Sequence, residues 1–171
     1  MKSFTILFTI LSLTIFSCSN QELETVSNVT VEKYMGTWYE IASFPSSFQK
    51  GCSCSKADYE LSEDKSYVKV INSCMKKGKQ GAVLGKAFVE EGSGNAKLKV
   101  QFFWPFTADY YIIALADDYS YAMVGHPNRD YLWILSRTKV MDENILNQLK
   151  ARAVELGFDT GKLLVTEQSC D

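Results

Sequence analysis

The most constraining feature of this 171-residue chain is a long series of short segments in which apolar residues recur at every second position. Alternation of this kind is typical of β-strands that bury one face, because successive side chains point to opposite sides of a sheet. The chain is therefore predicted to be mainly β. The pattern predicts eight strands, at Trp38–Phe44, Cys54–Leu61, Tyr67–Asn72, Ala82–Glu90, Lys97–Phe103, Asp109–Leu115, Tyr119–Gly125 and Tyr131–Arg137.

Short runs of turn-forming residues separate most of these strands, among them Ser62–Lys65, Lys76–Lys79 and Gly92–Asn95. Strands joined by such short connections pair antiparallel, whereas parallel strands need long and usually helical crossovers. No helical pattern is visible between the strands. We therefore expect an all-β fold, an eight-stranded antiparallel up-and-down β-barrel. The interior of such a barrel is either filled by side chains or holds one small ligand.

One amphipathic helix is predicted after the last strand. Asp142 is a good N-cap residue, and Gly157 suits the end of a helix. The apolar stripe between them needs a surface to cover, and the outside of the barrel is the surface available. A last short strand is expected over Leu163–Val165. The stripe consists of Ile145, Leu146, Leu149, Ala153 and Leu156.

The N-terminus carries the pattern of an export signal. Lys2 supplies a positive charge, and the run Phe4–Phe16 is interrupted only by Thr and Ser. As a helix this run would span roughly 20 Å, which is less than the ~30 Å hydrocarbon core of a bilayer. A signal peptide over residues 1–17 therefore fits better than a membrane anchor.

The end of this segment, Ile15 to Ser17 followed by Cys18, resembles a bacterial lipobox. The resemblance implies cleavage before Cys18, lipidation of its thiol and acylation of the new amino terminus, for which palmitate is the expected label. Ser19, which is not Asp, favours attachment to the periplasmic side of the outer membrane. An ordinary secretory signal is the alternative. Residues 18–29 are polar and acidic without apolar periodicity, which predicts a flexible tether before a folded domain over residues 30–171.

Charge and composition exclude several classes of function. The formal charge is −2, from 18 basic and 20 acidic residues, and no basic block is present, so nucleic acid is not an expected partner. His126 is the single histidine and lies in a turn, which argues against histidine-based zinc sites and acid–base catalysis. No hydrolase or phosphate-loop motif is present, so we expect no cofactor, no metal site and no catalytic residues.

Three motifs in a fixed order resemble a known family. Gly36–Ala42 resembles the Gly-x-Trp signature that opens the lipocalin barrel, Asp109–Leu115 resembles the second block of that family, and Trp133–Thr138 resembles the third. The chain is thus similar to lipocalins over Val31–Cys170, and most of all to bacterial lipocalin lipoproteins, with apolipoprotein D as an animal relative. The resemblance implies the same barrel and the same external helix.

The resemblance also implies which residues form the closed end of the barrel. These are Gly36, Trp38 and Arg137, with Arg137 stacked on Trp38 and donating to nearby backbone carbonyls. Such a cation–π contact contributes about 0.5–2 kcal/mol. We interpret these residues as structural and not as ligand contacts.

The ligand pocket is predicted from strand faces and from an apolar segment near a strand end. Residues 102–106, Phe-Phe-Trp-Pro-Phe, are unusually apolar for a turn, which indicates either a loop packed on its own barrel or a hydrophobic rim. Lys50 and Arg129 are candidates to meet an acidic headgroup. The candidate ligand-binding residues are Phe44, Leu98, Val100, Phe102, Trp104, Tyr111, Ile113, Tyr121, Met123 and Trp133.

Four cysteines follow Cys18, which allows three pairings in an exported protein. Cys52 and Cys54 are too close in one strand to bond easily to each other. The resemblance to apolipoprotein D implies Cys54–Cys170 and therefore Cys52–Cys74. The exchanged pairing, Cys52–Cys170 with Cys54–Cys74, stays open. The spacing is unlike that of paired zinc knuckles.

These observations favour a lipid-anchored lipocalin that binds, and transports or stores, a small amphipathic ligand such as a fatty acid or a lysophospholipid. A homodimer is a further candidate partnership. The first alternative is a lipid isomerase that uses a free Cys52 or Cys54 as nucleophile, which would need a thiolate and a base. The second is an envelope interaction protein with a filled barrel and no ligand.

Overall fold

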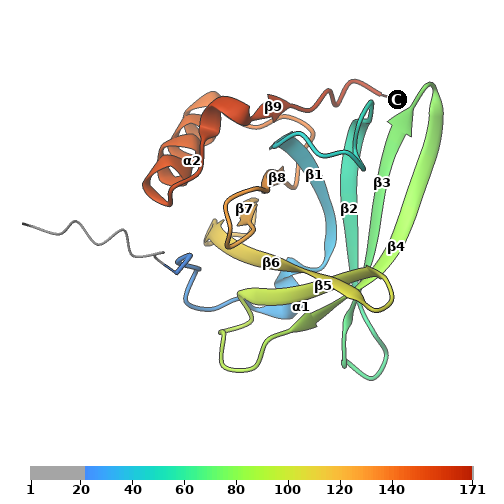
Figure 1. The fold of residues 1–171 in the computed structure, drawn as a ribbon, viewed down its shortest axis with the longest axis vertical. Helices are drawn as coiled ribbons and strands as arrows, with labels where there is room; N and C mark the ends of the chain where they lie inside the picture. The colour runs from blue at the N-terminus through green and yellow to red at the C-terminus, as the bar shows by residue number, and fades with distance from the viewer. Residues whose placement is uncertain (1–21, 171) are drawn as a thin grey trace, which may run out of the picture.

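A computed structural model describes residues 22–170 of the protein (Figure 1). The described chain consists of one β-barrel, one long helix outside it and several short elements. In chain order these are α1 (Val31–Tyr34), β1 (Gly36–Ser43), β2 (Ser53–Leu61), β3 (Val68–Lys76), β4 (Lys79–Val89), β5 (Lys97–Phe103), β6 (Phe106–Leu115), β7 (Tyr121–Gly125), β8 (Leu132–Ser136), α2 (Glu143–Glu155), the 3-10 helix η1 (Thr160–Lys162) and β9 (Leu164–Val165).

The barrel is an antiparallel meander that closes on itself. Each strand from β2 to β8 pairs with its neighbour in the chain, β8 pairs with β1, and β1 pairs with β2 through Gly36↔Tyr59 to Tyr39↔Lys56. The short β9 adds to β1 on the outside of this ring, opposite Ala42 and Ser43. The predicted eight-stranded antiparallel barrel is therefore confirmed.

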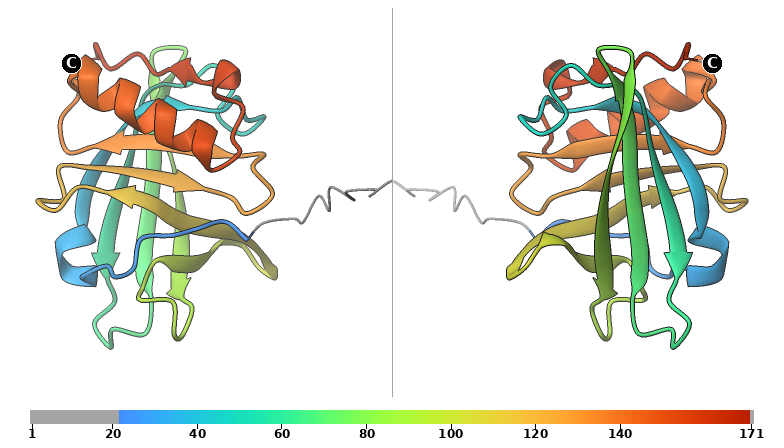
Figure 2. Two further views of the ribbon diagram at one scale, coloured as in Figure 1. Left: turned by 90° about the vertical axis from the view of Figure 1, so that its left-hand side faces the viewer. Right: turned by 90° about the vertical axis from the view of Figure 1, so that its right-hand side faces the viewer.

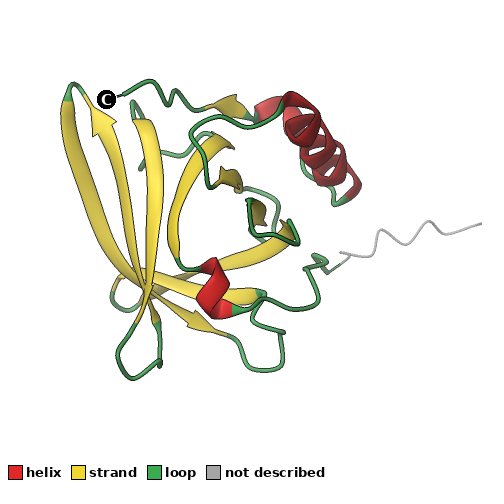
Figure 3. Ribbon diagram, turned by 180° about the vertical axis from the view of Figure 1, so that it is seen from behind, coloured by secondary structure: helices red, strands yellow, loops and turns green. Residues whose placement is uncertain are grey.

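Two apolar layers lie on the two sides of the barrel wall. The first fills the lower part of the interior and includes Trp38, Val70 and Val124. The second lies between the wall and α2 and includes Ile134 and Ala153. Figures 2 and 3 show α2 lying across the outside of β7 and β8. Strands β6 to β8 are thus covered on both faces, which explains why they are apolar nearly throughout.

Helix α2 begins and ends where the sequence predicts. The Asp142 side chain accepts hydrogen bonds from the backbone N–H groups of Asn144 and Ile145, and Gly157 follows the helix with a φ of +86°. A positive φ is adopted at little cost by glycine. The predicted stripe packs against the barrel, with Leu149 and Ala153 buried. No helix within residues 22–170 has the length and apolar character needed to span a membrane.

The hairpin between β3 and β4 is longer than predicted. The ladder continues to Lys76↔Lys79, beyond the predicted strand ends at Asn72 and Ala82. The two turn residues, Lys77 and Gly78, both have positive φ, which is the backbone of a tight two-residue hairpin. Alternation did not reveal this extension because residues 76–84 are exposed on both faces.

The flexible tether predicted for residues 18–29 is wrong for its described part, residues 22–29. Leu23 is buried in the layer under α2, and Val29 is buried at the base of the barrel. The Val26 N–H donates to the Ile112 carbonyl at 3.0 Å and the Val29 N–H to the Gly94 carbonyl at 2.8 Å. Spaced apolar residues and backbone hydrogen bonds hold this polar segment along the barrel. The predicted signal peptide and Cys18 lie outside the described residues.

Candidate functional site

The closed end of the barrel is built around Trp38. Its indole is fully buried and donates from Nε1 to the Tyr34 carbonyl at 2.8 Å. The Arg137 guanidinium lies over the indole, 3.8 Å from the ring centroid, and donates to the carbonyls of Thr37 and Lys33, each at 2.8 Å. Gly36 provides the positive φ of +91° that starts β1 beneath the guanidinium. This arrangement is the one that the family resemblance implies.

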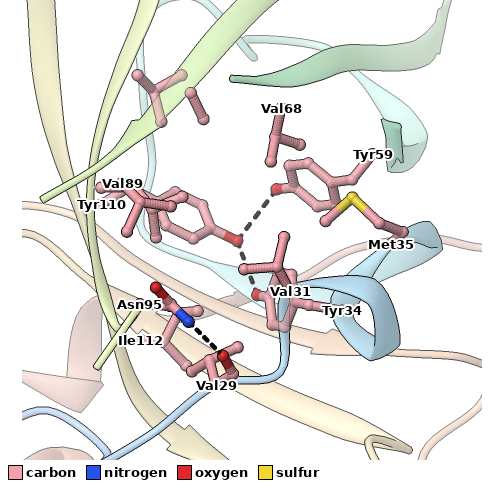
Figure 4. Close-up of a pocket in the computed structure, with 13 residues that line it drawn as sticks. Val29, Val31, Tyr34, Met35, Tyr59, Val68, Val89, Asn95, Tyr110 and Ile112 are labelled. Atoms are coloured by element: carbon pink, nitrogen blue, oxygen red, sulfur yellow. Dashed lines mark hydrogen bonds between the residues drawn. The ribbon is translucent and has the colours of Figure 1, made fainter. Parts of the chain in front are cut away.

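Three tyrosine hydroxyls meet above this base, as Figure 4 shows. The Tyr110 hydroxyl is 2.9 Å from that of Tyr34 and 3.0 Å from that of Tyr59. Burial raises the pKa of all three, that of Tyr59 to about 12, so the hydroxyls stay protonated at neutral pH. Three hydroxyl protons serve two hydrogen bonds, so one proton has no acceptor among the described residues.

The space beside the three hydroxyls is small and otherwise apolar. The volume that the centre of a water molecule can occupy is about 20 Å³, which is room for one water molecule. A single oxygen atom of a water or a ligand therefore fits against the unpaired hydroxyl proton. The walls are Val29, Val31, Tyr34, Met35, Tyr59, Val68, Ala87, Val89, Asn95, Leu98, Val100, Tyr110 and Ile112.

The interior becomes exposed toward the opposite end. Register with β3 places Ala87, Gly85 and Val83 on the inner face of β4. Ala87 is 2% exposed, whereas all residues from Lys79 to Leu84 are exposed on both faces of the strand, so this end of the wall opens to solvent. Val89, at the opposite end of the same face, is 38% exposed. The Phe102 ring packs over Gly85 of the adjacent β4, where a Cβ would stand only 2.7 Å from Phe102 Cδ1. The barrel is therefore closed at the Trp38 end and open at the other.

Four of the predicted pocket residues lie in the barrel interior. Leu98 and Val100 are buried in the interior layer, and Phe102 and Trp133 pack partly exposed against it, nearer the open end. Their strand faces follow directly from the alternation that predicted them. These four remain candidates for ligand contact.

Five predicted pocket residues are not in the interior, and that part of the prediction is wrong. All five lie in the layer between the wall and α2, and on β6 and β7 the inward face belongs instead to Tyr110, Ile112 and Val124. Because α2 covers the outside of these strands, both faces are apolar and alternation does not distinguish them. The five residues are Phe44, Tyr111, Ile113, Tyr121 and Met123.

Trp104, the tenth candidate, lies at the tip of the hairpin between β5 and β6. Its side chain is 85% exposed, so it contributes to the surface and not to a buried pocket. Of the two headgroup candidates, Lys50 is exposed in the loop after β1. Arg129 donates to the carbonyls of Pro127 and Leu156, which ties its guanidinium to the end of α2.

A buried carboxylate near the open end was missed by the sequence reasoning. Glu40 accepts hydrogen bonds from Ser43 at 3.0 Å, from Gln49 at 2.6 Å and from Thr166 at 2.6 Å. The Gln49 side chain also accepts from the Trp133 indole N–H at 3.3 Å. The carboxylate thus joins β1, the loop of residues 44–52 and the C-terminal tail. The only signal for this site in the sequence was an acidic residue, Glu40, at an alternating position of the strand that begins with the Gly-x-Trp motif.

The disulfides fasten the same end of the barrel. Cys52 bonds to Cys74 and Cys54 bonds to Cys170, which is the pairing implied by the resemblance to apolipoprotein D. No free thiol is therefore present in residues 22–170, and the nucleophile of the proposed isomerase is lacking there. Within the same residues, no cluster of three or more His, Cys, Asp and Glu side chains is arranged to bind a metal.

Comparison with known proteins decides the family. Residues 29–168 match the family described as the lipocalin-like domain. This protein is a lipocalin. It is 44% identical to temperature-induced lipocalin-1 of Arabidopsis thaliana over 158 residues, which cover 87% of this chain and 84% of the plant protein. Lipocalins are in general binding proteins and not enzymes.

Bacterial and animal lipocalins are also similar to this lipocalin. It is 39% identical to the outer membrane lipoprotein Blc of Escherichia coli, with 84% of this chain and 81% of Blc covered. It is 34% identical to bovine apolipoprotein D, with 82% and 78% covered. Insecticyanin from the tobacco hornworm Manduca sexta has the same fold, with a TM-score of 0.70, 20% identity, and 86% and 85% of the two chains covered.

Proposed function

We propose that this lipocalin binds one small amphipathic ligand, of the fatty acid or lysophospholipid class, through the open end of its barrel and holds or transports it at the cell envelope. The observation that carries the proposal is the exposure of both faces of β4 from Lys79 to Leu84, in contrast to the buried Ala87 further along the strand. A barrel filled at this end would bury the inward side chains of that stretch, among them Val83.

The distribution of polar groups supports an amphipathic occupant. The partly exposed interior aromatics Phe102 and Trp133 offer apolar surface below the mouth, where each buried acyl CH₂ group contributes about 0.8 kcal/mol. Exposed Lys50 lies on the loop of residues 44–52, on the side where an acidic headgroup would remain in water. Acyl carbons therefore belong inside the barrel and the headgroup belongs at the mouth.

Ligand binding is tested by native mass spectrometry and organic extraction of the protein purified from its host membrane, together with titration of a fluorescent fatty acid. We expect a co-purifying lipid and displacement of the probe by unlabelled fatty acid. Phe102→Ala should change the probe affinity by about fivefold or more. Phe88→Ala is the matched control, because Phe88 lies on the outer face of β4 beside Tyr67, and should change it by less than about twofold. Absence of both lipid and probe binding would reject the proposal.

We also propose that Cys18 is acylated and attaches the protein to the outer membrane. The lipobox-like sequence before Cys18 and the similarity to Blc, which is named an outer membrane lipoprotein, support this assignment. Metabolic labelling with palmitate tests it, with Cys18→Ser as the control. Label in the parent protein and none in the variant is expected, and an unlabelled parent would contradict the anchor. The native mass spectra also report whether two copies associate.

A further inference from the structure

Glu40 places a carboxylate on the inner face of the barrel wall. In the ladder between β1 and β8, Glu40 lies opposite Leu135 and Ser43 lies opposite Trp133, and both partners belong to the interior layer or pack against it. Residues that face each other across an antiparallel ladder point to the same side of the sheet. Glu40 is 6% exposed, and within residues 22–170 no basic side chain forms an ion pair with it. The carboxylate is thus buried among neutral hydrogen-bond donors.

The two oxygen atoms of this carboxylate are held in different ways. Oε1 accepts from the hydroxyl groups of Ser43 in β1 and of Thr166, whose own N–H donates to the Ile41 carbonyl of β1 at 2.9 Å. Among the described residues, Oε2 accepts only from Gln49 Nε2, at 2.6 Å. Oε1 is therefore fixed by the barrel wall, whereas the hydrogen bond to Oε2 depends on one side chain of a loop.

The loop that carries Gln49 is joined to the interior mainly through this side chain. In the described chain, the backbone hydrogen bonds of residues 45–51 stay within the loop. The Gln49 N–H donates to the Ser46 carbonyl at 3.3 Å, and the Cys52 N–H donates to the Gln49 carbonyl at 2.9 Å. Phe48, the residue before Gln49, is 65% exposed. The loop can therefore lift from the mouth without breaking a strand of the barrel.

The Gln49 side chain presents a donor and an acceptor side by side. Its Nε2 donates to Glu40, and its Oε1 accepts from the Trp133 indole N–H at 3.3 Å. A carboxamide matches this pair because it carries an N–H and a C=O on the same carbon atom. A free carboxylate does not match, since it only accepts hydrogen bonds and would meet the like charge of a second carboxylate in a buried place. Glu40 and Trp133 thus form a site for a neutral group that both donates and accepts.

We propose that Glu40 Oε2 and Trp133 Nε1 receive the head of the ligand in place of Gln49, and that they select a long-chain carboxamide over the fatty acid anion with the same chain. The amide N–H of the ligand donates to Glu40 and its carbonyl accepts from Trp133, while Gln49 turns into solvent with its loop. This assignment rests on the proposed binding function, because the chain below the head lies in the barrel.

The test compares three compounds that share one chain and differ only in the head, namely decanamide, methyl decanoate and decanoate. The amide offers a donor and an acceptor, the ester offers an acceptor without a donor, and decanoate is an anionic acceptor at neutral pH. Each compound is titrated against the full chain loaded with the neutral fluorescent probe N-phenyl-1-naphthylamine. We expect decanamide to bind the parent about tenfold more tightly than either of the other two compounds.

Two variants change the site in opposite directions. Glu40→Gln keeps the shape of the side chain and removes its charge, so the preference for decanamide over decanoate should fall to within about twofold. Gln49→Ala removes the side chain that competes with the ligand for the site. The affinity for decanamide should therefore rise about threefold or more, and by a larger factor than the affinity for methyl decanoate. A gain of affinity for one head cannot result from a misfolded barrel.

The matched controls are Glu155→Gln and Gln148→Ala, which make the same chemical changes at exposed positions of α2. Neither control should change any of the three affinities by more than about twofold. Equal binding of the three compounds by the parent, or an unchanged preference in Glu40→Gln, would overturn the assignment of the head site and leave ligand binding in the barrel intact. Failure of all three compounds to displace the probe would instead reject the proposed function, and the head site with it.

Discussion

The guanidinium of Arg137 lies 3.8 Å from the centre of the Trp38 ring and donates to two backbone carbonyls of the segment that precedes this ring. One side chain from the end of β8 thus joins the start of β1 to the short helix α1. The closed end of the barrel depends on this contact because it connects the two ends of the meander.

Replacement of Arg137 by lysine should lower the free energy of unfolding by about 1–3 kcal/mol, since an ammonium group does not reproduce the planar stack and the forked donors. Urea denaturation measures the loss. Arg152→Lys is the control, because Arg152 pairs with Glu24 and Glu155 at the surface of α2, and its cost should stay below about 1 kcal/mol. Equal costs for both variants would contradict the structural role of the stack.

Replacement of Tyr110 by phenylalanine should cost more than the same change at Tyr59. Tyr110→Phe removes both hydroxyl contacts and leaves Tyr34 and Tyr59 unpaired in an apolar pocket, for about 2–4 kcal/mol. Tyr59→Phe keeps the contact between Tyr34 and Tyr110 and should cost about 1 kcal/mol. Each variant lacks one phenolic oxygen atom relative to the parent. Equal losses of stability would therefore refute the central position of Tyr110.

Stability should decline in alkaline solution. The Tyr59 pKa is about 12 in the folded protein because burial disfavours the anion, whereas an exposed tyrosine has a pKa near 10. Above pH ~10 the unfolded chain therefore loses protons that the folded protein keeps. The free energy of unfolding should fall by up to about 1.4 kcal/mol per pH unit for each such tyrosine. Urea titrations from neutral to alkaline pH measure this slope, and Tyr59→Phe should reduce it.

The two disulfides should differ in their contributions. Cys54–Cys170 closes a loop with a sequence separation of 116, whereas Cys52–Cys74 closes one of 22. Chain entropy predicts about 5 kcal/mol for the first and about 3 kcal/mol for the second. Two variants, each with both cysteines of one disulfide replaced by serine, are compared by thermal and urea unfolding. The variant without Cys54–Cys170 should lose more stability than the variant without Cys52–Cys74. A larger loss without Cys52–Cys74 would mean that native contacts and not loop length determine the difference.

Leu23 should contribute to stability although it precedes the predicted domain. It is 1% exposed in the layer under α2, and Leu23→Ala should cost about 2–5 kcal/mol. Val140→Ala, at a position that is 81% exposed, is the control and should change the stability by less than about 0.5 kcal/mol. A cost near zero for Leu23→Ala would show that the N-terminal segment detaches in solution.

The candidate site was only partly predictable from the sequence. Leu98 and Val100 were assigned correctly because the outward residues of β5, such as Lys97 and Lys99, are charged and reveal the phase of the alternation. Tyr111 was assigned to the wrong face because its neighbours Tyr110 and Ile112 are equally apolar. Glu40 was missed because its three hydrogen-bond donors come from β1, a loop and the C-terminal tail.

The sequence by itself determined the architecture, since alternation, turns and capping are local properties that do not depend on how the barrel closes. Eight strands and the external helix after Asp142 were expected on these grounds, and the aromatic base at Trp38 was implied by the family resemblance. Only the tertiary structure decided which face of β6 and β7 points inward, because α2 covers the outside and removes the polar residues that would mark it. It also decided that the tether is docked along the barrel and that the tip at Trp104 is exposed, since burial depends on neighbours that are distant in the chain.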